Sequence, residues 1–199
     1  MADAARIQRD VKGTVAYLGQ VRKQGALRVQ AATPAHLRRA MAGVSRPDLA
    51  RRPAPGKWSI KEIICHLAAV EVVNGWRYRM ILAQPGSNLT AFDQDRWADE
   101  TDYRRQNPAL ALETFTALRR RHVALMRATP RSAWTRFGVH EERGRLSFHD
   151  LVDWIAAHDL NHLAQVARLR PPPGHPPPLP EALNPRRLHI IAVAPTRQE

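Results

Sequence analysis

The chain has 199 residues, of which 44% are hydrophobic, and this length and composition fit one domain with extensions. Its 31 basic and 18 acidic residues give a net charge of +13, but the basic residues are spread along the whole chain. Charge without a clustered motif provides nonspecific attraction and no binding groove, so nucleic-acid binding is not expected to be the main function.

The expected compartment is the cytoplasm. No apolar run approaches the ~18 residues that a membrane-spanning helix requires, so no membrane partner is expected. The N-terminus carries acids and lacks the apolar stretch of a secretory signal. A single cysteine, Cys65, cannot form an internal disulfide and suits a reducing environment.

Residues 1–32 are expected to be an N-terminal extension. Their apolar residues keep helical spacing, but Gly13, Gly19 and Gly25 interrupt it. This pattern predicts a partial helix on the outside of the main domain. The first main helix is predicted to begin at Thr33 as N-cap, with Pro34 as its first helical residue.

The second main helix has the strongest start signal. Ser59 and Glu62 form a capping-box pattern, in which each side chain bonds the other residue's free backbone N–H. The helix is predicted to run to about Ala83. Its inward-facing stripe includes His66.

Two long connections flank the third main helix, which Asn107 and Pro108 are expected to start and which ends near Ala128. Its core-facing stripe includes His122. The 84–106 connection is long enough to cross the domain, and 129–146 forms the second connection. Almost no strand is predicted. The two loops supply candidates for substrate selection: Asp93, Asp95, Trp97, Tyr103, Trp134 and His140.

The stretch Ser147 to Arg170 predicts the fourth main helix. Its apolar stripe, at steps of three and four residues, includes His158 and His162 one turn apart. The following segment, 171–199, is rich in proline at its start and is expected to be a C-terminal extension of polyproline character.

These elements predict an all-α fold, a four-helix bundle over residues 33–170. If the second and fourth helices are antiparallel, their three inward histidines lie within about 5 Å in height. A crossing 84–106 loop makes the second and third helices parallel. The expected topology is therefore up-down-down-up, with a long crossover between helices two and three.

His66, His158 and His162 allow two interpretations. They can be ordinary core histidines, or three ligands of one metal ion, because a His-x-x-x-His pair can share an ion with a ligand from a facing helix. Three neutral imidazoles suit zinc, nickel, iron(II) or copper. Three protein ligands also leave a coordination position open, which is the design of a catalytic site.

Two motifs carry a resemblance to a known family. Residues 58–71, W-S-I-K-E-I-I-C-H-L-A-A-V-E, are similar to the second-helix signature of the DinB/YfiT-like superfamily, and Pro53, Gly56 and Lys57 extend the match. Residues 158–165, H-D-L-N-H-L-A-Q, resemble its fourth-helix signature, H-D-x-x-H-x-x-Q. The likeness covers about residues 33–170.

The resemblance implies an up-down-down-up bundle, often a homodimer, with a divalent metal on His66, His158 and His162. We expect nickel or zinc, with iron or manganese as alternatives. Relatives include thiol-dependent S-transferases and proteins proposed as metal-dependent hydrolases. The expected function is thus a metal-dependent transferase or hydrolase acting on a small molecule, with a low-molecular-weight thiol as a candidate partner.

The remaining polar residues near these motifs are expected to support the metal site or line its pocket. They are Glu71, Asp159, Gln165 and His122. No residue stands out as the general base, so the catalytic group is not assigned. Two rival functions stay open: a metal- or ligand-binding bundle without turnover, and a basic nucleic-acid-associated protein.

Overall fold

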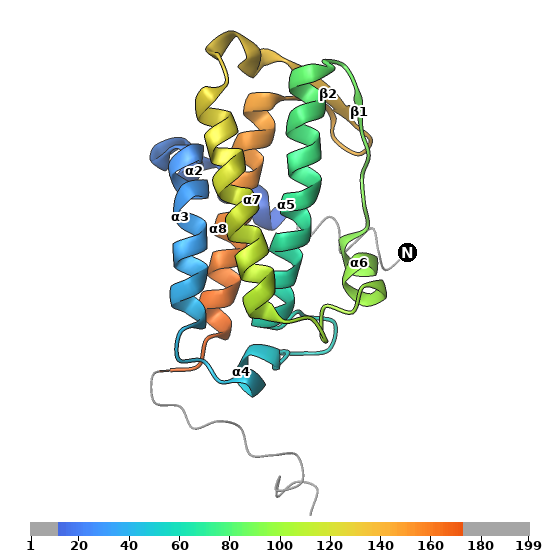
Figure 1. Cartoon of the computed structure of the whole chain (residues 1–199). Coiled ribbons are helices and arrows are strands. Elements are labelled where there is room, and N and C mark those ends of the chain that lie inside the picture. The colour runs from blue at the N-terminus through green and yellow to red at the C-terminus, as the bar shows by residue number, and fades with distance from the viewer. Residues whose placement is uncertain (1–11, 173–199) are drawn as a thin grey trace, which may run out of the picture.

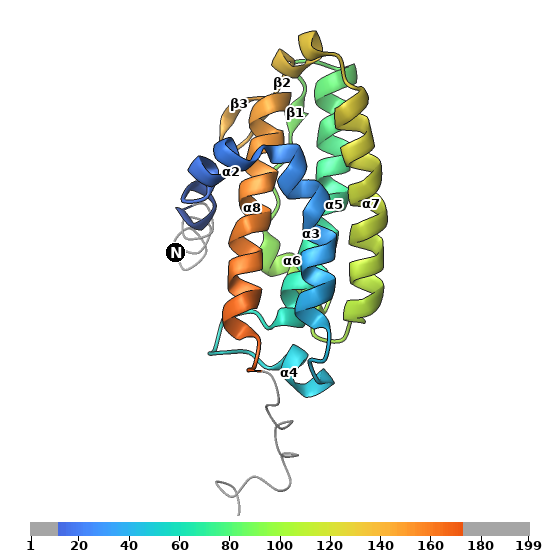
Figure 2. The ribbon, with the colours of Figure 1, turned by 90° about the vertical axis from the view of Figure 1, so that its left-hand side faces the viewer.

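The computed structural model describes residues 12–172, and its main feature is four long helices packed side by side (Figures 1 and 2). They are α3 (Ala26–Met41), α5 (Ile60–Ala83), α7 (Pro108–Ala128) and α8 (Phe148–Leu169). Shorter helices are α2 (Leu18–Gln24), α4 (Arg46–Ala50), α6 (Gln94–Glu100) and the 3-10 turn η1 (Arg131–Thr135). The strands are β1 (Asn88–Leu89), β2 (Phe137–His140) and β3 (Gly144–Ser147). Within the described residues, no helix is both long and apolar enough to cross a membrane.

Contacts at the two ends of the bundle fix the helix directions. After α5, strand β1 pairs in parallel with β2, which follows α7, and Arg136 donates from Nη1 to the Leu82 carbonyl at 2.6 Å. Therefore α5 and α7 end at the same end of the molecule. At the opposite end, Arg170 beyond α8 donates to the Ala42 carbonyl beyond α3 at 3.1 Å. Figure 1 shows the 84–106 segment returning along the bundle from the end of α5 to the start of α7.

The predicted starts of three helices are confirmed. Ser59 accepts from the Glu62 amide at 3.3 Å, while the Glu62 carboxylate accepts from the Ser59 amide at 2.9 Å, which completes the capping box. Ser147 and Asp150 form a second capping box at the start of α8. Asn107 caps α7 by accepting from the Ala109 amide at 2.9 Å.

The predicted start at Thr33 is wrong, because α3 begins at Ala26 and the expected 32/33 boundary falls inside it. Gly25, with φ +83°, separates α2 from α3. Pro34 lacks the N–H that would bond the Gln30 carbonyl, and Arg119 Nη1 approaches that carbonyl instead, at 3.4 Å. A contact from α7 thus lets α3 continue through its proline.

The expectation of an all-α chain is also corrected by a small three-stranded sheet in the order β1-β2-β3. Strands β2 and β3 form an antiparallel hairpin, with Phe137 opposite Ser147 and His140 opposite Gly144. Each strand has two to four residues, too few to give a periodic signal. Of the expected extensions 1–32 and 171–199, residues 1–11 and 173–199 lie outside the described residues, and so does most of the proline-rich segment.

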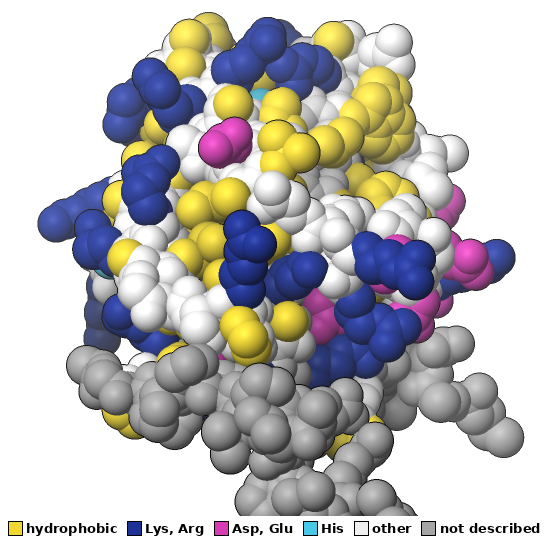
Figure 3. All heavy atoms as spheres, turned by 60° about the horizontal axis from the view of Figure 1, so that its bottom comes forward, with side chains coloured by type: hydrophobic (Ala, Val, Ile, Leu, Met, Phe, Trp, Pro, Cys, Tyr) yellow, Lys and Arg dark blue, Asp and Glu magenta, His cyan; other side chains and the backbone are white. Residues whose placement is uncertain are grey.

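Charged side chains are interleaved on the surface. On the face of Figure 3, lysine and arginine are scattered among apolar and acidic side chains. This distribution agrees with the spread of arginine along the sequence. On this face the net charge of +13 is therefore not gathered into one basic patch.

Gly75 allows α5 and α7 to approach each other. A Cβ at Gly75 would lie 2.5 Å from Nε2 of His122. We predict that Gly75→Ala lowers the free energy of unfolding by about 1–3 kcal/mol, because the buried His122 ring must move. Urea denaturation followed by circular dichroism measures this change.

The matched control is Gly19→Ala in α2, where a Cβ meets no atom within 4 Å. This substitution should leave stability unchanged or raise it by up to about 1 kcal/mol, since alanine favours the helix. Equal effects of the two substitutions would show that the close contact at Gly75 does not matter.

Candidate metal centre

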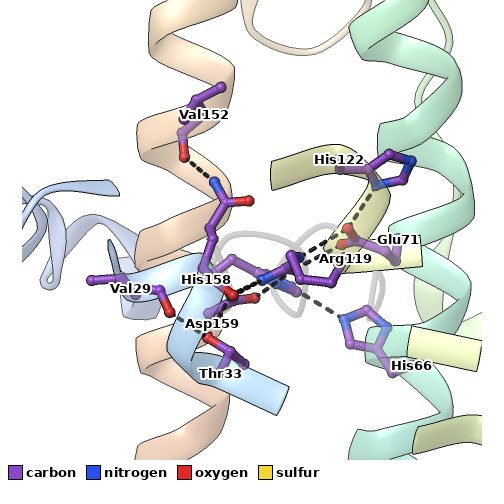
Figure 4. A network of polar contacts seen from close by, with 10 residues as sticks. Val29, Thr33, His66, Glu71, Arg119, His122, Val152, His158 and Asp159 are labelled. Atoms are coloured by element: carbon purple, nitrogen blue, oxygen red, sulfur yellow. Dashed lines mark hydrogen bonds and ion pairs between the residues drawn. The ribbon is translucent and has the colours of Figure 1, made fainter. Parts of the chain in front are cut away.

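Three histidine rings from two helices converge in the core. His66 lies on α5, and His158 and His162 lie one turn apart on α8. The Nε2 atom of His158 is 3.2 Å from Nε2 of His66 and 3.1 Å from Nε2 of His162. All three residues are buried, and Figure 4 shows His66 and His158 facing each other between the helices. The antiparallel arrangement of α5 and α8 places the rings at the same height.

The rings of His66 and His158 are neutral. Burial lowers the pKa of both His66 and His158 well below the ordinary value, and the neighbouring imidazoles lower it further. Nδ1 of His162 lies 3.1 Å from Oε1 of Gln165. Because that oxygen only accepts, Nδ1 of His162 carries the proton and its Nε2 presents a lone pair to the other rings.

This donor set fits a metal ion. Tetrahedral coordination with metal–nitrogen distances of about 2.0–2.1 Å requires nitrogen atoms roughly 3.3 Å apart. The two measured Nε2–Nε2 distances, 3.2 and 3.1 Å, are close to that value. When the protons of the neutral rings are on Nδ1, the Nε2 lone pairs face one another, and a shared cation removes their repulsion. Among the described residues, His66, His158 and His162 are the group of potential metal ligands whose ligand atoms lie close together, all within 4.8 Å of one another.

A cavity of about 510 Å³ reaches His162. The indole of Trp58 covers the centre, with its ring centroid 4.7 Å from that of His66 and 6.4 Å from that of His162. The cavity combines apolar surface from Trp58 and Ile63 with polar side chains from three segments of the chain. These polar residues are Lys57, Gln94, Asp95, Asn161, Gln165 and Arg168.

Arg119 ties the four long helices together beside this centre (Figure 4). Its guanidinium pairs with Glu71 on α5, at 2.9 Å from Nε and 2.7 Å from Nη2. It also pairs with Asp159 on α8, where Nη2 lies 3.1 Å from Oδ1. Thr33 on α3 donates to Asp159 at 2.9 Å, and Nδ1 of His122 lies 2.7 Å from Glu71. Every one of these side chains is buried.

The pKa values of the two carboxylates of this network shift in opposite directions. Burial alone raises the pKa of Glu71, but the charge of Arg119 and the hydrogen bond from His122 outweigh it and bring the pKa to about 2. Burial raises the pKa of Asp159 despite the same arginine.

The residues predicted to surround the histidines divide into two groups. Gln165 contacts His162 directly. Glu71, Asp159 and His122 contact Arg119 or one another, and their positions make them structural links between helices. Asp159 is nevertheless next to His158 in sequence, so the network fixes the stretch of α8 that carries the ring.

Sequence reasoning did not single out Arg119 as a functional residue. Arg119 stands on the core-facing stripe of α7 with His122, and this helical spacing is the signal that could have found it. Cys65 is buried, and burial raises the pKa of its thiol to about 11. A thiol this hard to ionise suits a small core residue.

The chain matches a known protein family over most of its length. The model for the DinB superfamily matches residues 10–166. The chain belongs to the DinB superfamily. The resemblance of the two helix motifs is thus confirmed, and both motifs lie within the matched range.

Individual relatives are distant. A protein of Oceanobacillus iheyensis is 25% identical over 123 residues, which cover 60% of this chain and 68% of the relative. YfiT of Bacillus subtilis is 21% identical over 139 residues, which cover 68% of this chain and 78% of YfiT. Both names assign their proteins provisionally to the metal-dependent hydrolases.

A solved structure of the B. subtilis protein shares the fold. It is described as YfiT, a probable metal-dependent hydrolase with an unusual four-helix bundle topology. The match has a TM-score of 0.69 at 20% identity and covers 74% of this chain and 85% of that chain. At this identity the likeness concerns the fold alone.

Arg119 carries a stability prediction. Arg119→Met leaves Glu71 and Asp159 buried without their cation, so we predict a loss of about 3–5 kcal/mol in the free energy of unfolding. The control Arg120→Met changes the next, exposed arginine and should stay within about 0.5 kcal/mol of wild type. Urea denaturation of the metal-free proteins measures both. Equal stability of the two variants would refute the role of the network.

Glu71 carries a pH prediction. Because its pKa of about 2 in the folded chain lies below the roughly 4.3 of an unfolded glutamate, ionised Glu71 stabilises the fold above about pH 4.5. That stabilisation is lost as pH falls towards 2. The free energy of unfolding of wild type should therefore fall more steeply from pH 6 to pH 3 than that of Glu71→Gln. Asp159 titrates in both proteins, so parallel curves would contradict the assignment.

Proposed function

We propose that His66, His158 and His162 hold one divalent metal ion and that the protein is a metal-dependent enzyme of hydrolase type. The observation that carries this proposal is that the Nε2 atoms of His66 and His162 lie 3.2 and 3.1 Å from Nε2 of His158. Three imidazole nitrogens directed at one another are a set of ligands.

The chain's own residues prepare this site. Gln165 holds His162 in the tautomer whose Nε2 can bind a metal. Burial keeps His66 and His158 in the neutral form that ligation requires. When bound, a divalent ion supplies Lewis acidity, which polarises a substrate group and lowers the pKa of water. Trp58 and the cavity walls would orient a substrate and limit the water around it.

The relatives support hydrolysis more than thiol transfer. The names of the O. iheyensis and B. subtilis proteins assign them provisionally to the metal-dependent hydrolases. The cavity of about 510 Å³ at His162 is large enough for a small molecule. A thiol substrate and a homodimer remain part of the wider proposal. Nickel or zinc is proposed as the ion, since both accept imidazole ligands.

We also propose the up-down-down-up order for the whole bundle. Its support is the parallel direction of α5 and α7, joined through β1 and β2, together with the Arg170–Ala42 contact between the ends of α8 and α3. This order makes α5 antiparallel to α8 and so brings His66 to the pair on α8. The fold and the metal site therefore depend on the same crossover, the 84–106 segment.

Metal analysis tests the proposal. Wild-type protein stripped with a chelator and reloaded with zinc or nickel should retain about one ion per chain, because three ligands converge on one point. His158→Ala should lose stoichiometric binding. Gln165→Leu should bind about 10–100-fold more weakly, because it no longer orients His162. Inductively coupled plasma mass spectrometry after gel filtration gives the stoichiometry.

The matched control is His149→Ala, which changes an exposed histidine on the same helix and should retain the ion. Wild type without a stoichiometric ion, or His158→Ala with one, would overturn the metal site. Turnover of a panel of esters and amides by loaded wild type, absent in His158→Ala, would then separate an enzyme from a binding protein. Thiol consumption with electrophiles tests the transferase alternative in the same samples.

A further inference from the structure

A second, smaller cavity adjoins the histidine centre. Its volume is about 80 Å³, and His158 forms part of its wall. The other walls come from α5, α8, the β2–β3 hairpin and the 84–106 crossover segment. Gln94 lines both this cavity and the larger one at His162. The three histidines therefore lie between an outer cavity and a small inner one.

The inner cavity is lined by buried polar atoms that lack hydrogen-bond partners within the described structure. Asn74 on α5 is 0% exposed, and neither its amide nitrogen nor its amide oxygen has a partner. One turn further along α5, Arg77 is 7% exposed and its Nε has no partner. Nδ1 of His158 is also buried and also has no hydrogen-bond partner among these residues. Buried polar groups of this kind are costly unless something polar satisfies them, so the site is built for a polar occupant.

The charge of the cavity selects the sign of that occupant. Arg77 and Arg143 line it together with one carboxylate, Glu142. Burial and the charge of Arg143 lower the pKa of Arg77 only to about 10, so its guanidinium stays positive at neutral pH. The lining carries two positive charges against one negative charge, and Glu141, outside the lining, adds a second negative charge that acts on Arg77. The feature that favours an anion is therefore the buried Nε–H of Arg77, a charged donor without a partner among the described residues.

His140 adds a neutral donor to the same wall. Its Nδ1 accepts from the Glu142 amide at 3.2 Å, so the proton of the neutral ring is on Nε2. Burial lowers the pKa of His140 to about 4, with Arg77 and Arg143 adding to the effect, and the ring is therefore neutral at pH 7. The hairpin that was not expected from the sequence brings this residue to the cavity.

We propose that the inner cavity binds the carboxylate group of a small-molecule substrate, through Arg77, Asn74 and the Nε2–H of His140. The proposal rests on the metal-dependent function, because it places the reacting part of that substrate at the three histidines. A carboxylate matches the site in charge, in size and in accepting several N–H donors at once. The substrate class is thus a small carboxylic acid derivative whose carboxylate points inward past His158.

The position of Arg77 supports a binding role alongside a structural one. One guanidinium nitrogen, Nη2, donates to the Thr90 carbonyl at 2.6 Å and so anchors the crossover segment. The unpartnered Nε remains for a ligand. The side chain of Asn74, in contrast, has no hydrogen-bond partner in the described part of the chain, so its substitution separates binding from stability.

The test is a titration with sodium acetate, followed through the arginine Nε–H resonances of ¹⁵N-labelled protein. Arg77→Met identifies the Arg77 resonance by its loss. Acetate should shift this resonance saturably, whereas chloride at equal ionic strength should not. Arg79→Met, an exposed arginine on the same helix, should leave the acetate response unchanged.

Asn74→Leu is the decisive variant. It should weaken acetate binding by about ten-fold or more, the effect of one hydrogen bond to a charged group. Its urea midpoint should stay the same or rise, because a buried amide without partners does not stabilise the fold. Unchanged acetate affinity in Asn74→Leu, or an Arg77 resonance that does not respond to acetate, would overturn the proposal.

Metal-free and zinc-loaded samples separate this proposal from the metal site. Acetate binding at Arg77 in the metal-free protein supports the carboxylate site even if the chain retains no ion. Stoichiometric zinc with no effect of acetate on Arg77 refutes the carboxylate site alone. Acetate binding that requires zinc and leaves the Arg77 resonance unmoved indicates direct binding to the ion and also refutes it.

Discussion

The structure depends on one buried guanidinium held by two carboxylates. Arg119 on α7 pairs with Glu71 on α5 and Asp159 on α8, and it approaches the Gln30 carbonyl that Pro34 leaves without a helical partner on α3. One side chain thus contacts all the other long helices. Two buried carboxylates would be unstable without it. The same contacts hold α5 against α8 near the point where their histidines meet.

Precise placement is what turns three core histidines into a candidate centre. A metal site tolerates only small errors in the positions of its ligands, so the ligands belong on rigid elements. His66 lies within two turns of a capping box on α5, and His158 and His162 share one face of α8. Gln165 then sets the tautomer of His162. Cavities on both sides give the centre room for a substrate, an outer one at Trp58 and an inner one at Asn74.

The sequence predicted features whose cause is local. Capping residues predicted the starts of α5, α7 and α8, and helical spacing predicted that His158 and His162 share one face. The sequence-based prediction failed where a feature depends on residues far away along the chain. Thr33 and Pro34 form a plausible helix start, yet α3 continues through them, and Arg119, far along the chain, approaches the carbonyl that Pro34 leaves free. Strand β1 has two residues and gains its structure only by pairing with β2, and the cavity at Arg77 needs that same hairpin.

X-ray absorption spectroscopy of the zinc-loaded protein tests the central claim most directly, because it reports the ligands of the ion itself. Three histidines that share one ion predict three imidazole nitrogens at about 2.0–2.1 Å, with the outer-shell scattering of imidazole rings. The spectrum of His158→Ala should lose one of those rings. A sulfur ligand at about 2.3 Å, or a wild-type spectrum with fewer than three imidazoles, would contradict the account.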